Sequence, residues 1–197
     1  MELILIRHGL PERSAQTDDP PLSAIGRNQA RRVAQRLAGE RIDAVIASTM
    51  RRAIETAQPY AQDAGLDIDA RPGIVEFDRG SGAYVPMEDL KREDYAAWRA
   101  MAEGRHGVDI GAFHAMVVEC LEAVVQANSG KTVAVFCHGG VINVWTAHVL
   151  GMEPRLFFEP GYASLHRYMC ARTGQRNLVA LNDMAHLAGQ PAPVTAG

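Results

Sequence analysis

Short apolar runs alternate with amphipathic helical patterns along this chain, and the alternation limits the fold more than any other feature. Runs rich in Ile, Leu and Val predict buried strands, and apolar residues at helical spacing follow each run. In chain order these patterns occupy residues 2–7, 23–40, 43–48, 49–65, 133–136 and 141–151. Strands that alternate with helices in this way predict an α/β fold, a three-layer sandwich whose mostly parallel central sheet carries helices on both faces.

The remaining segments give shorter patterns of the same two kinds. They predict a short strand within residues 66–76, helices at 86–102 and 111–128, and strands within 163–171 and 177–183. Ser23 is the expected N-cap of the first helix. Pro59 lies inside the second helical pattern, where its ring should kink the helix or divide it.

Length and patterning together predict one domain. We expect residues 1–187 to form it, with residues 77–108 as a lid that sets specificity, and the small, Pro-containing segment 188–197 as a flexible tail. The net charge of −3 gives no global attraction to nucleic acid or to an anionic membrane. No stretch is expected to approach the roughly 18 apolar residues of a membrane span.

The three cysteines are scattered and contain no CxxC pair. Such usage suits reduced thiols in a cytoplasmic protein better than a disulfide framework. Cys137 adjoins His138, which raises the alternative of a cysteine nucleophile. A small buried residue at the end of a strand is the favoured interpretation of Cys137.

Polar and charged groups follow three of the expected strands at their carboxyl ends, where open α/β sheets bind ligands. They are Arg7-His8-Gly9 after the first strand, Ser48 with Arg51 and Arg52 after the second, and His138-Gly139-Gly140 before the last helix of the alternating series. Guanidinium groups, imidazoles and a helix N-terminus at one sheet edge suit phosphate. A neutral imidazole is also a good nucleophile toward phosphorus, and the glycines would let the backbone approach the ligand. Arginine neighbours oppose a divalent metal, so no metal is expected.

Four blocks of the sequence, in order, resemble the histidine phosphatase superfamily of phosphoglycerate mutase-like proteins. They are "LILIRHG", "ASTMRRAIETA", "GIVEFDRG" and "VFCHGGVI", and with the tail "LVALNDMAHL" the resemblance covers residues 2–187. It implies that His8 becomes phosphorylated while Arg7, Arg52 and His138 hold the phosphate. The acid that protonates the leaving group maps to Glu76, whose pKa would have to be raised, with Asp78 as the rival. No cofactor is implied.

Departures from the mutase pattern favour a phosphatase that hydrolyses a small phosphorylated metabolite. Leu10-Pro11 follows the RHG motif, Ser14 stands where mutases place an Asn, and the lid is short. Ser14 and Gly139 join Arg7, Arg52 and His138 as expected substrate-binding residues. A phosphoglycerate mutase-type phosphotransferase and a non-catalytic domain that binds a phosphorylated ligand stay open as alternatives. The apolar surface of an exposed edge could support a homodimer.

The lid segment contains several long side chains that could reach a substrate. They are Tyr84, Lys91, Arg92, Trp98, Arg99 and Arg105. For most of them a solvated helix face, with Trp98 packed into the core, is the favoured interpretation. A second Arg or Lys in the pocket would instead favour a doubly anionic substrate such as a phosphorylated acid.

Overall fold

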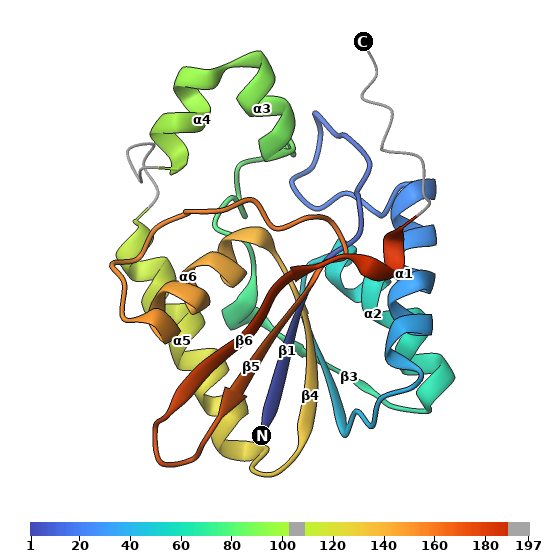
Figure 1. The fold of residues 1–197 in the computed structure, drawn as a ribbon. Coiled ribbons are helices and arrows are strands. Elements are labelled where there is room, and N and C mark those ends of the chain that lie inside the picture. The colour runs from blue at the N-terminus through green and yellow to red at the C-terminus, as the bar shows by residue number, and fades with distance from the viewer. Residues whose placement is uncertain (103–108, 189–197) are drawn as a thin grey trace.

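The computed structural model describes residues 1–102 and 109–188 and contains one six-stranded mixed sheet (Figure 1). The strand order is β3-β2-β4-β1-β5-β6. The strands are β1 (Glu2–Arg7), β2 (Ala44–Ser48), β3 (Ile68–Arg71), β4 (Thr132–Cys137), β5 (Leu165–Cys170) and β6 (Arg176–Asp183). The first four run parallel, β5 pairs antiparallel with β1, and β6 pairs antiparallel with β5. The predicted α/β class and mostly parallel sheet are confirmed.

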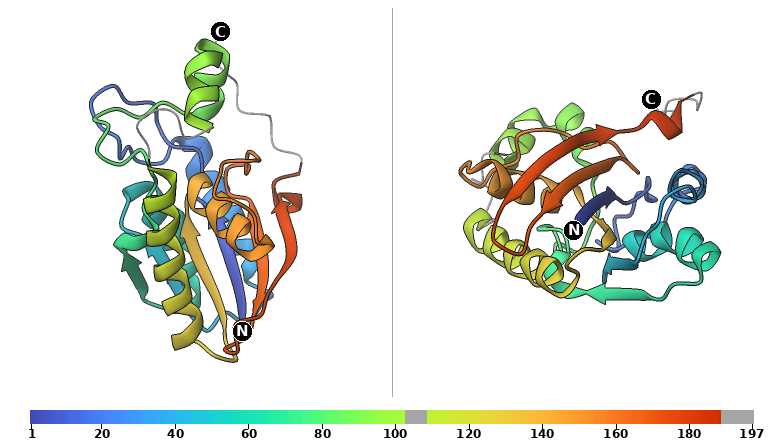
Figure 2. Two further views of the ribbon diagram at one scale, coloured as in Figure 1. Left: turned by 90° about the vertical axis from the view of Figure 1, so that its left-hand side faces the viewer. Right: turned by 60° about the horizontal axis from the view of Figure 1, so that its bottom comes forward.

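Helices cover both faces of the sheet, as Figure 1 and the two views of Figure 2 show. On one face α1 (Ala24–Leu37) packs beside α2 (Arg51–Ala64), and on the other α5 (Ile110–Ala127) packs beside α6 (Gly139–Leu150). The two faces have separate cores because side chains alternate along each strand. Leu3 and Leu5 pack with α5 and α6, whereas Ile4 and Ile6 pack on the side of α1 and α2.

The pairing of β1 with β4 positions the chemistry-bearing residues. Ile6 pairs with Phe136 and Arg7 with Cys137 in parallel register. The apolar residues of both strands, 3–6 in β1 and 133–137 in β4, are fully buried. A one-residue slip would turn each side chain to the opposite face of the sheet, out of one core and into the other. The residues that follow the two strands, His8 and His138, therefore emerge next to each other.

Helix boundaries follow local chemistry, with two differences from the sequence patterns. Ser23 caps α1 as expected, because its hydroxyl accepts a hydrogen bond from the Gly26 N–H. Pro59 does not divide α2, which runs unbroken to Ala64. The segment expected as one helix at 86–102 forms two, α3 (Met87–Glu93) and α4 (Tyr95–Ala102). Asp94 separates them because its carboxylate accepts from the Ala97 N–H and begins a new helix.

Helix α5 is the one element of the described ranges that is long and apolar enough to cross a membrane. It has 18 residues with a mean hydropathy of 1.4, so the expectation that no stretch approaches such a span was wrong. Its Phe113, Val117 and Leu121 belong to the core against the sheet, and 28% of the helix is buried inside the structure. Apart from Ala188, the expected tail lies outside the described residues, and the single-domain division stays a prediction.

Candidate active site

Three strand ends and two following segments bring the expected residues together at one edge of the sheet. Arg7 ends β1, Ser48 ends β2, His138 is the N-cap of α6, and Arg52 lies in the first turn of α2. The short 3-10 helix η1 (Pro72–Ile74) follows β3 and leads to Glu76. The rings of His8 and His138 have centroids 5.1 Å apart, and both side chains are buried.

The ring of His8 is oriented by its own main chain. Nδ1 lies 2.8 Å from the Gly9 carbonyl oxygen, so Nδ1–H donates there and Nε2 keeps its lone pair. The Nε of Arg52 lies 3.3 Å from that Nε2. Burial, together with the positive charges of Arg52 and Arg7, holds the pKa of His8 well below its ordinary value. His8 therefore presents a neutral imidazole nitrogen of the kind that attacks phosphorus.

His138 is held in the opposite sense by Ser48. The Ser48 hydroxyl accepts from the Met50 N–H and lies 2.8 Å from His138 Nε2, so it can donate to that nitrogen. The other ring nitrogen, Nδ1, is buried without a hydrogen-bond partner among the described residues. The pKa of His138 is also well below its ordinary value, chiefly through burial. His138 is therefore a neutral imidazole whose Nδ1 is available to a ligand.

Three buried nitrogens in this region have no hydrogen-bond partner among the described residues: Arg7 Nε, Arg52 Nη2 and His138 Nδ1. Buried donors normally have partners, so a group of unpartnered donors indicates a ligand. Arg7, His8, Arg52 and Glu76 line one cavity of about 250 Å³. Two guanidinium groups beside a neutral imidazole in this cavity are groups of the kind that bind a tetrahedral oxyanion in proteins.

Arg52 is positioned by contacts on each side of its guanidinium. Nη1 donates to the Asp18 carbonyl oxygen at 2.8 Å, and Nη2 lies 3.6 Å from Asp78 Oδ1. The guanidinium also lies over the ring of Tyr84, 4.8 Å from its centroid. Asp78, the rival for the general acid, thus faces Arg52. Its pKa is raised by burial, with the Arg52 charge opposing.

Glu76 lies deep in the site and accepts two main-chain hydrogen bonds. Gly140 N–H donates to Oε2 at 2.9 Å, and Phe77 N–H donates to Oε1 at 3.1 Å. Burial and the nearby charge of Asp78 nevertheless raise the pKa of Glu76 to about 7. A carboxyl with that pKa can give a proton and take it back near neutrality, which a general acid and base must do.

The glycines of the two motifs make room for groups of the protein itself. A Cβ on Gly140 would lie 2.2 Å from Glu76 Oε1, so this glycine makes room for the carboxyl. A Cβ on Gly9 would lie 2.7 Å from the carbonyl oxygen of Gly26 in α1. Gly9 therefore allows close packing of the first motif against a helix, and the expected approach of the backbone to a ligand stays a prediction. A Cβ on Gly139 would make only ordinary contacts.

Ser14 is placed differently from the other expected substrate-binding residues. Its hydroxyl accepts from the Gln16 and Thr17 N–H groups, each at 3.2 Å, and its main chain pairs with Tyr84. Ser14 is not among the residues that line the two cavities at the site. Its hydroxyl thus shapes a turn at the edge of the lid. Gly139, in contrast, lines a second cavity of about 400 Å³ that adjoins the first.

Arg7 has partners that the sequence patterns did not reveal. Its Nη1 donates to Glu88 Oε1 at 3.1 Å and to the Pro160 carbonyl oxygen, and its guanidinium lies 3.9 Å above the ring centroid of Tyr162. The Tyr162 hydroxyl donates to Glu88 Oε2 at 3.1 Å. Glu88 belongs to α3, so the segment expected to be a lid contacts Arg7 directly. No sequence motif marks Glu88 or Tyr162.

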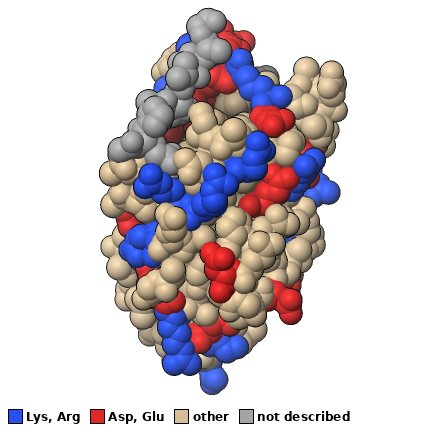
Figure 3. Space-filling model, turned by 90° about the vertical axis from the view of Figure 1, so that its right-hand side faces the viewer, with Lys and Arg blue, Asp and Glu red and all other residues tan. Residues whose placement is uncertain are grey.

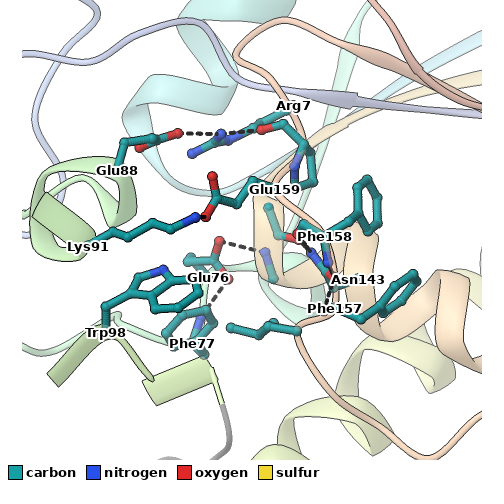
Figure 4. A pocket seen from close by; sticks show the side chains of 14 residues that line it. Arg7, Glu76, Phe77, Glu88, Lys91, Trp98, Asn143, Phe157, Phe158 and Glu159 are labelled. Carbon is teal, nitrogen blue, oxygen red and sulfur yellow. Dashed lines mark hydrogen bonds and ion pairs between the residues drawn. The ribbon is translucent and has the colours of Figure 1, made fainter. Parts of the chain in front are cut away.

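The second cavity, of about 400 Å³, adjoins the first through Arg7, Glu76 and Phe77 (Figure 4). The lid contributes Glu88, Lys91 and Trp98 to its wall. Trp98 was expected in the core but faces this cavity, whereas Arg92 pairs with acidic neighbours on the surface as expected. Arg105 lies outside the described residues. Within the described ranges, no group of His, Cys, Asp and Glu could hold a metal ion.

The fold places imidazole, guanidinium and carboxyl groups at one edge of the sheet, and comparison with known proteins supplies the family. A sequence model of the histidine phosphatase superfamily (branch 1) matches residues 3–184. The chain belongs to that superfamily, as the sequence blocks predicted.

Relatives within the family carry names of more than one activity. The chain is 27% identical to phosphoserine phosphatase 1 of Hydrogenobacter thermophilus, over 95% of this chain and 94% of that protein. It is also 27% identical to a probable phosphoglycerate mutase of Yersinia enterocolitica, over 78% of this chain and 77% of that protein. Among solved structures, a mutant phosphoserine phosphatase of Entamoeba histolytica in complex with phosphoserine matches with a TM-score of 0.76 and 26% identity, over 94% of this chain and 98% of that one.

Proposed function

We propose that the protein is a metal-independent phosphatase that hydrolyses a phosphomonoester of a small metabolite through a phosphohistidine on His8. One observation carries the proposal: a neutral imidazole nucleophile and a carboxyl with a pKa of about 7 line the same buried, arginine-rich cavity. Relatives named as phosphoserine phosphatases, over nearly the whole chain, support hydrolysis of a small phosphorylated metabolite.

In the first step His8 Nε2 donates its lone pair to phosphorus, and the bond from phosphorus to the leaving oxygen breaks. Glu76 gives its proton to that oxygen, which departs as an alcohol. Arg7, Arg52 and His138 donate to the phosphoryl oxygens as their charge is redistributed. The Gly9 carbonyl oxygen keeps accepting from Nδ1–H and stabilises the phosphorylated ring.

In the second step a water attacks the phosphoryl group from the side that the alcohol has left. Glu76, now a carboxylate, takes a proton from the water while the bond between phosphorus and Nε2 breaks. Inorganic phosphate forms, and both His8 and Glu76 return to their starting protonation states. Asp78 is less suited to this role because it faces Arg52 at 3.6 Å.

Hydrolysis of p-nitrophenyl phosphate in the presence of EDTA tests the proposal. We expect turnover that EDTA does not reduce and that His8→Ala abolishes. Protein that is quenched in alkali after incubation with radiolabelled substrate should carry label that is stable in base and labile in acid, as a phosphohistidine is. Ligand binding without turnover would favour a binding domain, and loss of turnover in EDTA would favour a metal-dependent hydrolase.

The mutase alternative needs its own assay, because one relative is named a probable phosphoglycerate mutase. Isomerisation of 3-phosphoglycerate is measured with and without a bisphosphoglycerate primer, in parallel with phosphate release. We expect phosphate release to exceed isomerisation under both conditions. Primer-dependent isomerisation faster than phosphate release would replace the phosphatase proposal with the mutase.

We also propose a cytoplasmic protein, which the three free cysteines support. On the face formed by α1 and α2, basic and acidic side chains are interspersed (Figure 3). A homodimer through the β5–β6 edge stays a prediction, for which the exposed Met169 and Val179 are the apolar surface. Light scattering during size-exclusion chromatography measures the oligomeric state.

A further inference from the structure

The larger cavity lies where the leaving alcohol of a substrate must be accommodated. It shares Arg7, Glu76 and Phe77 with the cavity that contains His8, and it extends from Glu76 between the lid helices and residues 156–160 (Figure 4). Glu76 is the proposed proton donor to the leaving oxygen, so the alcohol lies beside it. Aromatic side chains on both sides give the cavity an apolar body.

Charged groups in this cavity form two pairs. Glu88 Oε1 accepts from Arg7 Nη1 at 3.1 Å, and Glu159 Oε1 accepts from Lys91 Nζ at 2.8 Å. Lys91 is the second cation that would favour a phosphorylated acid, but Glu159 already neutralises it. Arg7 pairs with Glu88 through Nη1, and its unpartnered Nε is the donor proposed for the phosphate. Within the described part of the wall, no cation is therefore left over for a substrate carboxylate.

Two hydrogen bonds hold the Glu88 carboxylate in the wall of the cavity that would accommodate the alcohol. Its two oxygens are held separately, one by Arg7 and the other by the Tyr162 hydroxyl at 3.1 Å. Its pKa lies below the ordinary value because of Arg7 and these hydrogen bonds, against the effect of burial, so the group is ionised at neutral pH. When the phosphate engages Arg7, the cavity keeps the charges of Glu88, Glu159 and Lys91, and their sum is negative.

We propose that Glu88 is a specificity-determining residue that, with Glu159, selects phosphomonoesters of uncharged or cationic alcohols over those of hydroxy acids. The inference rests on the proposed phosphatase function and specifies its substrate class. An ammonium or neutral group on an apolar body gains from the aromatic walls and the carboxylates, whereas a carboxylate meets two like charges.

Three phenethyl phosphates that differ only at the para position test this selection. They carry an aminomethyl, a methyl or a carboxylate group, so the leaving chemistry is the same and the remote charge varies. We expect the wild type to hydrolyse the aminomethyl and methyl esters with a kcat/KM at least about tenfold above that of the carboxylate ester. Glu88→Gln keeps the shape and should reduce that ratio by about tenfold. Glu93→Gln, on the exposed side of α3, should leave the ratio unchanged.

Each other outcome contradicts the selection by Glu88. A wild type that prefers the carboxylate ester, and loses that preference in Lys91→Gln, would assign Lys91 as the carboxylate-binding group. An equal fall for all three esters in Glu88→Gln would mean that Glu88 only positions Arg7. Hydrolysis of p-nitrophenyl phosphate that depends on His8 reports the phosphatase function independently, so failure of the selection and failure of the function are distinguishable.

Discussion

Arg52 Nε lies 3.3 Å from His8 Nε2, so the guanidinium and the proposed attacking nitrogen share one buried pocket. The contact gives Arg52 two effects. Its charge helps hold the pKa of His8 below the ordinary value, and its unpartnered Nη2 is free to donate to a phosphoryl oxygen. Both effects need a planar group that holds several nitrogens in fixed directions.

Arg52→Lys should therefore lower kcat/KM for p-nitrophenyl phosphate by about 10²–10³-fold, the usual loss of a preorganised donor. A lysine keeps the charge but cannot contact the Asp18 carbonyl oxygen, His8 and the phosphate together. Arg51→Lys is the matched control, because Arg51 is exposed and pairs with Glu55. A similar fall in both variants would show that the loss comes from altering helix α2 and not from the pocket.

The raised pKa of Glu76 predicts how activity depends on pH. Phosphoenzyme formation from an alkyl phosphate needs the protonated carboxyl, so its rate should fall as pH rises through about 7. Glu76→Gln should remove that limb and slow alkyl phosphates far more than p-nitrophenyl phosphate, whose leaving group needs little protonation. Rapid-quench measurement of the phosphoenzyme between pH 5 and 9 provides the check. An unchanged pH limb in Glu76→Gln, and its loss in Asp78→Asn, would assign the acid to Asp78.

The same shift makes stability depend on pH. Because the pKa of Glu76 is higher in the folded than in the unfolded protein, the folded state binds the extra proton. Its contribution is full below about pH 4.5 and is lost as pH rises through about 7. Between pH 5 and 8 the free energy of unfolding of the wild type should fall, relative to Glu76→Gln, on the order of 2 kcal/mol. Urea unfolding of both proteins across this range measures it, and parallel curves would mean an unshifted carboxyl.

Gly140 and Gly139 differ in a way that mutation can separate. A Cβ on Gly140 would meet Glu76 Oε1 at 2.2 Å and Phe77 Cδ1 at 2.6 Å, whereas one on Gly139 comes no closer than 3.6 Å to Arg7 Nε. Gly140→Ala should displace the acid and lower kcat/KM for alkyl phosphates by about 10²-fold, in the range for loss of a general acid. Gly139→Ala should have a much smaller effect. Equal losses would show that the helix N-terminus matters and the room beside Glu76 does not.

The sequence was most informative for segments that are buried on both faces and end in polar groups. Strands β1 and β4 are apolar on both faces and end abruptly in polar groups, so both the strands and the placement of His8 and His138 could be predicted. The required rise in the pKa of Glu76 could be stated, but its cause, burial with Asp78 nearby, needed the folded chain.

Contacts between distant segments could not be predicted from local patterns. Arg7 and Glu88 are 81 residues apart, and Tyr162 and Glu88 are 74 apart, so nothing in either segment indicates the other. Trp98 was misplaced for the same reason, since a helical pattern shows which residues are apolar but not whether the core or a cavity receives them. The break at Asp94 had a local signal, because Asp is a strong N-cap.

The close packing of Gly9 against Gly26 predicts a stability effect opposite to helix propensity. Gly26 lies in α1, where alanine is ordinarily more favourable by about 1 kcal/mol. A Cβ there would nevertheless lie 2.1 Å from the Leu10 carbonyl oxygen, which is main chain and cannot move aside without shifting the RHG segment. Gly26→Ala should therefore destabilise the protein by about 2–3 kcal/mol, as overpacking does.

Gly39→Ala is the matched control for Gly26→Ala, since a Cβ at Gly39 has no neighbour within 4 Å. It should be neutral, or stabilising by less than about 1 kcal/mol, because alanine reduces the conformational entropy of the unfolded chain. Urea unfolding at pH 6 measures both variants. The displaced RHG segment carries His8, so Gly26→Ala should also lower kcat for p-nitrophenyl phosphate under conditions where it is fully folded. A stable Gly26→Ala protein with normal kcat would show that α1 can shift without moving the nucleophile.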